Sequence, residues 1–253
     1  MSKTKLNYRT LMGLLRSLWM YYSVPFQARG LGKFYSAFIQ PGDLCFDIGA
    51  HVGSRLRVFS RMGARVVALE PQPLFADLLR LLFGRKPNVT LLQKAVGAQI
   101  GEAQMLVSER APTVSSLSGW WVVAVQARDR TFQNVNWNAT LKVEVTTLDA
   151  LIEAYGQPAF IKIDVEGYEL EALKGLTKPV KALSFEYIAT TLEIPLGCVD
   201  YLRELAVYEF NYTIIEAVNF ALPEWVDADQ IIACLEQLPL AATSGDVYAR
   251  RID

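Results

Sequence analysis

The sequence has one histidine, three cysteines and almost no net charge, and each of these shortages excludes a class of protein. Because His51 is the only histidine, a histidine metal cluster is excluded. Cys45, Cys198 and Cys234 form an odd, scattered set without paired spacing, which argues against a disulfide framework or a zinc site. A formal charge of -1 gives no sign of the basic patch that nucleic-acid binding usually requires, so we expect no nucleic-acid partner.

Long apolar runs are also missing. No stretch reaches the ~18 consecutive apolar residues that read as a transmembrane helix, so we expect no transmembrane segment. Residues 1–24 begin with lysines and an apolar run, but Arg16 interrupts that run and no small-residue cleavage site follows, which disfavours a signal peptide. We expect an amphipathic helix that packs on the domain or contributes to a homodimer, with a membrane-surface anchor as a third alternative. A cytoplasmic location is the default expectation.

What the chain does contain is enough apolar material for one large domain. Its 253 residues are 52% hydrophobic, which fits a single α/β domain with a full core. We expect a helical extension over residues 1–40 and the domain itself over residues 41–253.

The stretch from Gly42 to Gly53 organises this domain. Residues 44–48 are a short, mostly apolar run, the pattern of a buried parallel strand. A turn through Gly49 follows, and residues 54–62 carry helical periodicity. Strand, glycine turn and helix form the first unit of a nucleotide-binding α/β sheet.

The rest of the chain alternates strands and helices, which predicts a parallel sheet with right-handed crossovers. The expected strands lie at residues 65–70, 88–92, 102–107, 159–164, 181–186, 212–216 and 246–250, and the expected helices at 28–40, 74–83, 149–155, 168–174, 199–210 and 227–238. The alternation breaks at residues 108–145, where we expect an inserted hairpin or flap. This insertion either widens the sheet or forms part of a substrate wall or lid.

Acidic residues stand at the ends of several expected strands. Open α/β sheets bind ligands outside the carboxyl ends of their strands, and Asp47, Glu70, Asp164 and Glu186 lie at such ends. Carboxylates gathered at one sheet edge repel one another and need a ligand or a base to stabilise them. The pattern therefore favours a ligand-binding site at the carboxyl ends of the strands.

The spacing of these acids and glycines narrows the ligand. Glu70 lies 23 residues past Asp47, near the ~20-residue interval at which an acid binds ribose hydroxyls. The dinucleotide motif Gly-x-Gly-x-x-Gly is incomplete, because His51 stands where its middle glycine would be. Asp47 would also repel a pyrophosphate. A nucleoside with a cationic tail, S-adenosylmethionine, fits these residues better.

These motifs resemble the FkbM family of methyltransferases. The resemblance rests on the Asp47-to-Gly53 turn, on Glu70-Pro71 and above all on the run from Phe160 to Glu169, and it covers roughly residues 40–190. It implies a Rossmann-like class I methyltransferase fold: an α/β seven-stranded, mostly parallel sheet with an antiparallel last strand and helices on both faces. It also implies S-adenosylmethionine as cofactor and a hydroxyl of a polyketide, a sugar or another small molecule as methyl acceptor.

Resemblance and position together give each residue an expected role. The expected cofactor-binding residues are Asp47, Gly49, Ala50, His51, Gly53, Glu70, Pro71, Gln72, Ala95 and Ser115. Glu70 holds the ribose, and Gln72 and Ala95 lie beside the adenine. Glu186 and Trp137 are candidates for acceptor binding.

Methyl transfer from a sulfonium is an SN2 displacement in which the enzyme mainly aligns the nucleophile. An alcohol nucleophile also needs a base, for which Asp164 is the first candidate and Glu166 the second. Glu166 is equally well explained as a helix-capping acid. Lys162 shares a strand face with Asp164, and we expect a partner for it among Asp164, Glu166, Glu186 and Asp47, since an unpaired buried charge is very unfavourable. His51 is a further base candidate, although a turn residue beside the cofactor is the preferred interpretation.

Other functions compete with this one. An N-methyltransferase or a Mg²⁺-dependent O-methyltransferase is compatible with the same fold, and in the second case Asp164 and Glu186 would hold the metal. Lys162 argues against a metal, so none is expected. A nicotinamide-dependent oxidoreductase is disfavoured by the missing glycine, and a non-catalytic S-adenosylmethionine-binding module is disfavoured by the retained acids.

Overall fold

A seven-stranded sheet forms the centre of the computed structural model, which describes residues 27–215, 217–239 and 244–252. The strand order is β3-β2-β1-β7-β8-β10-β9. The strands are β1 Leu44–Ile48, β2 Arg65–Leu69, β3 Val89–Leu92, β7 Phe160–Ile163, β8 Ala182–Ile188, β9 Tyr208–Tyr212 and β10 Ser244–Arg251. In this described sheet β10 pairs antiparallel with β8 and with β9, while the other pairs are parallel. The predicted mostly parallel sheet with an antiparallel last strand is confirmed.

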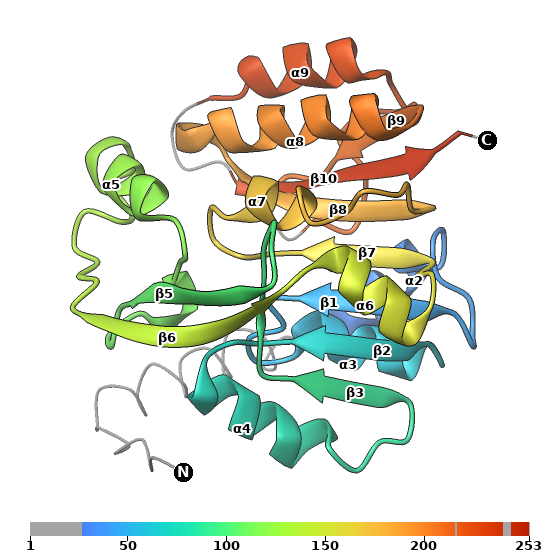
Figure 1. The fold of residues 1–253 in the computed structure, drawn as a ribbon. Coiled ribbons are helices and arrows are strands. Elements are labelled where there is room, and N and C mark those ends of the chain that lie inside the picture. The colour runs from blue at the N-terminus through green and yellow to red at the C-terminus, as the bar shows by residue number, and fades with distance from the viewer. Residues whose placement is uncertain (1–26, 216, 240–243, 253) are drawn as a thin grey trace.

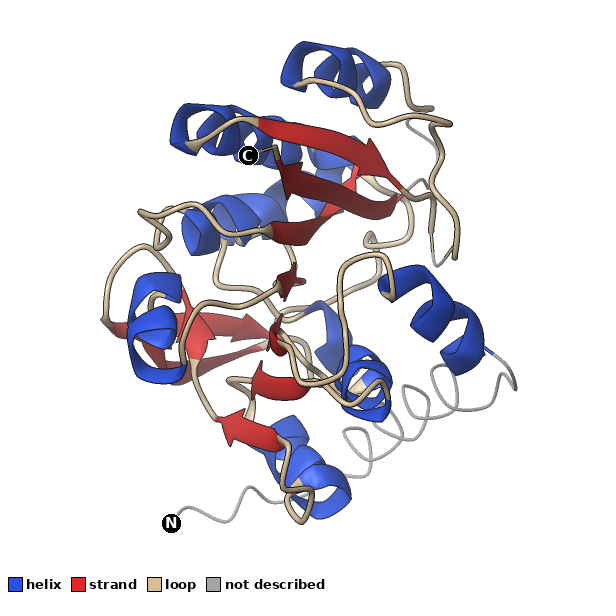
Figure 2. Ribbon diagram, turned by 90° about the vertical axis from the view of Figure 1, so that its right-hand side faces the viewer, coloured by secondary structure: helices blue, strands red, loops and turns tan. Residues whose placement is uncertain are grey.

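Helices cover both faces of this sheet (Figure 2). They are α2 Gln27–Tyr35, α3 Ser54–Arg61, α4 Pro73–Phe83, α5 Gly119–Arg128, α6 Leu148–Tyr155, α7 Glu169–Leu173, α8 Glu193–Leu205 and α9 Ala228–Glu236. The buried side chains of α2, α3 and α4 gather with one set of strand residues, and those of α6, α7, α8 and α9 gather with the other. The helices thus pack on the sheet through two apolar layers, one on each face.

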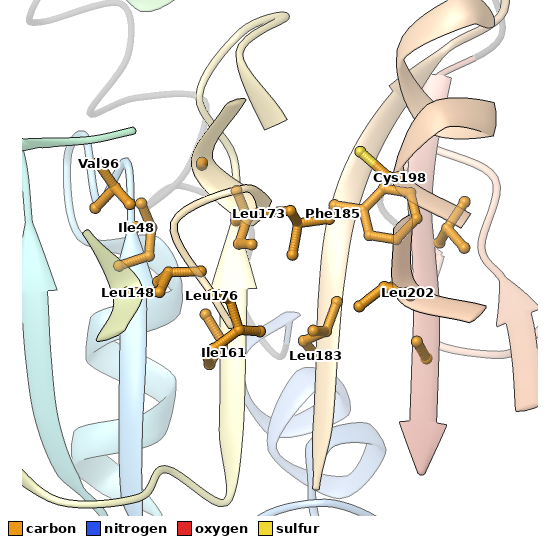
Figure 3. Close-up of a cluster of buried hydrophobic side chains, with 14 of the residues drawn as sticks. Ile48, Val96, Leu148, Ile161, Leu173, Leu176, Leu183, Phe185, Cys198 and Leu202 are labelled. Carbon is orange, nitrogen blue, oxygen red and sulfur yellow. The ribbon is translucent and has the colours of Figure 1, made fainter. Parts of the chain in front are cut away.

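The two layers follow from alternation along the strands. Leu44, Phe46 and Ile48 belong to the cluster under α6 to α9, whereas Cys45 between them belongs to the cluster under α2 to α4. Figure 3 shows the first cluster, in which Leu183 and Phe185 of β8 pack against side chains of the helices on that face. Strands buried on both faces must be apolar at nearly every position, which explains the continuous apolar runs of the sequence.

The parallel strands β1, β2, β3 and β7 all point their carboxyl ends toward the side where β5, β6 and α5 lie (Figure 1). Here β4 Ala95–Val96, β5 Gly101–Val107 and β6 Ala139–Thr146 form a separate three-stranded sheet in the order β4-β6-β5. The short 3-10 helices η1 Pro112–Val114 and η2 Ala189–Thr191 complete the described elements. Only β6 of this small sheet begins within residues 108–145, and the small sheet is separate from the main one, so the insertion does not widen the main sheet.

The apolar run inside the insertion is a helix and not a strand of a hairpin. In α5 the buried residues are Trp121, Val122, Ala124 and Val125, a helical spacing, while Trp120 and Val123 are exposed. The Ser118 hydroxyl caps the helix by accepting a hydrogen bond from the backbone N–H of Trp121 at 3.1 Å. After α5 the chain returns in β6, which pairs antiparallel with β5, a strand that precedes the insertion.

Two other boundaries differ from expectation. The strand expected at residues 212–216 is β9, which begins at Tyr208, and α8 ends at Leu205 instead of continuing to residue 210. Tyr208 and Phe210 are buried at alternate positions, which is the period of a strand. Tertiary packing therefore overrides the sequence pattern that predicted a helix up to residue 210.

The helix expected over residues 1–24 and the homodimer proposed through it lie outside the described residues. The neighbouring α2 is packed into the domain, because Leu31 and Tyr35 are buried in the cluster under α2 to α4. Within residues 27–215, 217–239 and 244–252, no helix has the length and apolar character that crossing a bilayer would require.

Truncating one core leucine tests this packing. Leu183 on β8 is fully buried, whereas Leu81 on α4 is 81% exposed. We expect Leu183→Ala to lower the free energy of unfolding by about 2–5 kcal/mol, because it removes apolar contacts and leaves a cavity. Leu81→Ala, the matched control, should change it by less than about 0.5 kcal/mol. Urea unfolding measures both, and equal effects would contradict the placement of β8 in the core.

Candidate active site

The turn after β1 and the turn after β7 touch each other at the carboxyl edge of the sheet. Gly49 has φ of 82°, and a Cβ at this position would lie 1.8 Å from the carbonyl oxygen of Asp164. The backbone N–H groups of Gly49 and Ala50 donate to the carbonyl of Leu69, at 3.0 and 2.9 Å. Glycine is therefore required here both for its positive φ and for the close approach of two backbones.

A cavity opens where these turns meet the insertion. It holds about 930 Å³ of empty space, including the part open to solvent. Of the residues predicted to form the site, the cavity brings together Asp47, Gly49, Ala50, His51, Glu70, Pro71, Gln72, Ala95, Ser115, Lys162, Asp164 and Glu166. It adds Ser54, Arg55, Met105, Thr113 and Leu117, which sequence reasoning missed. Gly53, Glu186 and Trp137 are not among its lining residues.

Glu70 is held at the end of β2 by two backbone hydrogen bonds. Its carboxylate oxygens accept from the backbone N–H of His51 at 2.9 Å and of Gln72 at 2.8 Å. Burial raises the pKa of this carboxyl to about 7, against the lowering effect of those two hydrogen bonds. Each oxygen has a second acceptor site, so the pair can also receive the two hydroxyls of a vicinal diol.

Asp47, the last residue but one in β1, faces α3. Burial raises the pKa of its carboxyl to about 6, while the positive charges of Lys162 and Arg55 act in the opposite direction. Its Oδ2 atom is buried and finds no hydrogen-bond partner within the described part of the chain. A buried carboxylate oxygen in this condition fits a site that receives a cationic group.

His51 and Gly53 shape the turn between β1 and α3. His51 has φ of 48°, and its ring packs edge-on against Phe75 with ring centroids 4.2 Å apart. Burial lowers the pKa of the His51 imidazole to about 4, so the ring is neutral at physiological pH. Gly53 serves packing, since a Cβ there would lie 2.7 Å from Phe83 and 2.8 Å from Leu79 of α4.

The insertion closes the cavity near Gln72. The side-chain amide of Gln72 donates to the carbonyl of Pro112 at 3.1 Å, and its carbonyl oxygen accepts from the Ser115 hydroxyl at 3.2 Å. Trp137 supports this wall from behind, since its indole N–H donates to the carbonyl of Val114 at 2.8 Å. The expected acceptor-binding residue Trp137 thus packs within the insertion, against Trp121.

Lys162 lies in the middle of β7 with 1% exposure and two acidic partners. Its ammonium donates to Asp164 Oδ2 at 3.2 Å and to Asp246 Oδ1 at 2.8 Å. The expected partner Asp164 is confirmed, and Asp246 is a second one that sequence reasoning missed. The signal in the sequence was the position of Asp246 at the start of the last expected strand. In the structure β10 lies beside β8 and places Asp246 opposite Glu186.

Three carboxyl groups meet beside Lys162. Asp164, Glu166 and Glu186 each offer an oxygen within 4.8 Å of the other two. Burial raises the pKa values of Glu166 and Glu186 well above the ordinary range, and the charge of Asp164 raises both further. Glu186 thus joins the catalytic candidates, although it borders a small neighbouring hollow lined also by Trp121 and Gly167.

The turn that carries Asp164 and Glu166 is fastened to the insertion. Glu166 has φ of 54°, and its carbonyl accepts from the Ser116 hydroxyl at 2.6 Å. A Cβ on Gly167 would lie 2.1 Å from the ring of Trp121, so this ring lies directly on the turn. Glu169 accepts from the backbone N–H groups of Val165 and Gly167, at 3.0 and 3.2 Å. These contacts fix the acids relative to the cavity.

The family model described as the methyltransferase FkbM domain matches residues 47–237, which include every strand end just described. The chain belongs to the FkbM methyltransferase family. The resemblance inferred from the motifs is thereby confirmed, and the family's cofactor is S-adenosylmethionine.

Individual similar proteins are more distant. The hexuronic acid methyltransferase AglP of Haloferax volcanii is 25% identical over 146 residues, which are 56% of this chain and 54% of that protein. The chain thus spans about half the length of this curated relative. A TehB-like S-adenosylmethionine-dependent methyltransferase from Corynebacterium glutamicum has a TM-score of 0.48 at 9% identity, with 96% of each chain covered. A precorrin-6y C5,15-methyltransferase from Geobacter metallireducens has a TM-score of 0.46 at 13% identity, covering 100% of this chain and 94% of that one.

The residues of the cavity fit S-adenosylmethionine. Glu70 offers a fixed pair of oxygens for a ribose, and the orphaned Oδ2 of Asp47 suits a cationic tail. Gly49 lines the same cavity.

The titration of two acids predicts how cofactor affinity depends on pH. Glu70 and Asp47, with pKa values of about 7 and 6 in the ligand-free protein, both take up protons between pH 8 and pH 5. Because a cation binds the ionised forms better, affinity for S-adenosylmethionine should fall with falling pH, by up to about tenfold per unit for each group. Isothermal titration calorimetry between pH 8 and pH 5 measures this.

The control is Glu70→Gln, which should lose the part of the pH dependence near pH 7 and keep the part near pH 6. His51 does not contribute, since its pKa of about 4 keeps it neutral throughout this range. An affinity that is constant from pH 8 to pH 5 would contradict both assignments.

Proposed function

We propose that the chain transfers the methyl group of S-adenosylmethionine to a hydroxyl of a small, sugar-like acceptor. The observation that carries the proposal is the position of Asp164. Its side chain is 40% exposed, lines the same cavity as Asp47 and Glu70, and is held from below by the buried ammonium of Lys162. A fixed carboxylate beside the cofactor residues is suited to bind an acceptor hydroxyl and take its proton.

When bound, the cofactor supplies a methyl group activated by a sulfonium. The protein has to align the cofactor with the acceptor, and different residues of the chain contribute to this alignment. Glu70 binds the ribose hydroxyls, Asp47 stabilises the positive tail, and Asp164 accepts the proton of the acceptor hydroxyl. Lys162 holds Asp164 at a fixed place and stays cationic, because Asp164 and Asp246 both raise its pKa against the effect of burial. Glu166, with a raised pKa, is the second candidate for binding the acceptor.

The acceptor class rests on two observations. The relative from Haloferax volcanii is named for a hexuronic acid, which supports a sugar acceptor. Burial and the charge of Asp164 raise the pKa values of Glu166 and Glu186 well above the ordinary range, which favours protonated carboxyls beside Asp164. A protonated carboxyl both donates and accepts hydrogen bonds, as recognition of sugar hydroxyls requires.

Replacing Asp164 tests the base. We expect Asp164→Asn to reduce turnover about 10²–10⁴-fold, because the amide cannot accept a proton. The affinity for S-adenosylmethionine should stay within about threefold of the wild type. Formation of S-adenosylhomocysteine, measured with a panel of hexuronic acids and neutral sugars, reports turnover, and Asp77→Asn on the exposed side of α4 is the control. Unchanged turnover in Asp164→Asn would refute the base assignment.

A metal-dependent transfer is the second candidate function. It is favoured by the three carboxyls of Asp164, Glu166 and Glu186, whose oxygens lie close enough together to bind one hard divalent cation. It is opposed by Lys162, whose ammonium already bonds Asp164 at 3.2 Å. We therefore expect wild-type turnover to persist in excess EDTA. A loss of activity that Mg²⁺ restores would establish the metal-dependent reaction instead.

A further inference from the structure

The methionyl tail of S-adenosylmethionine ends in an ammonium and a carboxylate, and the acids of the cavity account for only the first. Asp47 and Asp164 line the cavity where β1 and β7 end. These carboxylates attract the sulfonium and the ammonium but repel the carboxylate. If the chain binds the cofactor as proposed above, a cation must receive that carboxylate.

Among the described residues, three cationic side chains line the cavity: Arg55, Lys94 and Lys162. The ammonium of Lys162 is buried between Asp164 and Asp246. Lys94 lies between β3 and β4 and pairs with Glu144 of the second sheet at 3.2 Å. Arg55 stands in the first turn of α3 beside Ser54, and it is one of the charges that lower the pKa of Asp47. Arg55 is therefore the cation placed at the tail end of the cavity.

A buried chain of hydrogen bonds holds Arg55. Its Nε donates to the Tyr35 hydroxyl at 3.1 Å, and that hydroxyl lies 3.4 Å from the hydroxyl of Tyr248. The Tyr248 hydroxyl donates to Asp246 Oδ2 at 3.3 Å, and Asp246 Oδ1 accepts from Lys162. The same lysine bonds Asp164. The guanidinium is thus fixed in relation to the proposed base.

We propose that the guanidinium of Arg55 binds the methionyl carboxylate of S-adenosylmethionine, and that Tyr35 positions it. Arginine suits this ligand because its planar fork of N–H donors matches the two oxygens of a carboxylate. The positive end of the α3 dipole adds to the attraction. Through the hydrogen-bond chain, a carboxylate bound at Arg55 sets the distance between the methyl donor and Asp164.

Two ligands that differ only in the carboxylate test the proposal. Calorimetry with S-adenosylmethionine and with decarboxylated S-adenosylmethionine compares the wild type with Arg55→Met. The variant should lose affinity for S-adenosylmethionine by about 10- to 100-fold, the size expected for a charge-assisted hydrogen-bonded pair. Its affinity for the decarboxylated ligand should stay within about threefold. Arg61→Met, at the exposed end of α3, should behave as the wild type for both ligands.

Tyr35→Phe keeps the ring and removes the hydroxyl, and we expect a smaller loss with the same selectivity for the carboxylate. Arg55→Lys keeps the positive charge but lacks the planar fork of donors. Its affinity for S-adenosylmethionine should lie between those of Arg55→Met and the wild type. It replaces Arg55→Met in the test if that variant does not fold. Equal losses for both ligands would show a merely structural arginine and overturn the proposal.

The same assay separates the other outcomes. If the wild type binds neither ligand, the proposed function itself fails. An acidic sugar acceptor is another source of a carboxylate. If Arg55→Met leaves both cofactor affinities unchanged and raises KM for hexuronic acids but not for neutral sugars, the arginine binds the acceptor and the cofactor assignment is overturned.

Discussion

The arrangement of the candidate site depends most on one buried charge, the ammonium of Lys162. It lies within the apolar sheet, where an unpaired ion is several kcal/mol less stable than in water, and two carboxylates on different elements compensate it. Asp164 belongs to the turn after β7, and Asp246 belongs to β10, the strand that runs against its neighbours. Removing Lys162 would leave two carboxylates without their shared counter-ion, whereas removing either carboxylate would leave the lysine with the other. A buried ion pair adds little net stability, and its value here is that it fixes the position of a reactive carboxylate.

Backbone packing supplies the second constraint. The contact of Gly49 with the carbonyl of Asp164 brings the cofactor turn against the turn of the acids, and the ring of Trp121 lies on Gly167 from the other side. Hydrogen bonds from Ser116 and within the turn complete the support. The acids are therefore placed by rigid turns that are short in sequence but held by three distant parts of the chain. Such over-determined turns tolerate the positive φ of a residue like Glu166.

The sequence was sufficient for the parallel sheet and most cavity residues, because strand ends and glycine turns are local signals, whereas the antiparallel last strand was implied by the resemblance to the FkbM family. It was insufficient where tertiary contacts decide. Trp121 reads as part of a β-rich apolar run, yet a cap at Ser118 and a buried helical face make it a helix. Asp246 is far from Lys162 in the chain, and only the strand order brings them together. Arg55 follows a recognised motif, but its part in the cavity depends on the distant hydroxyl of Tyr35.

The cavity is lined by two parts of the chain, the turns of the main sheet and the region of the small sheet β4-β6-β5. The cofactor turns belong to the main sheet, whose order and register cannot change without loss of the fold. Met105, Thr113, Ser115 and Leu117 belong to the region of the small sheet, outside that order. Loops and insertions accept changes in length and composition far more readily than packed strands. Within such an architecture, the cavity wall from the region of the small sheet can change while the strand order that places the cofactor turns is kept.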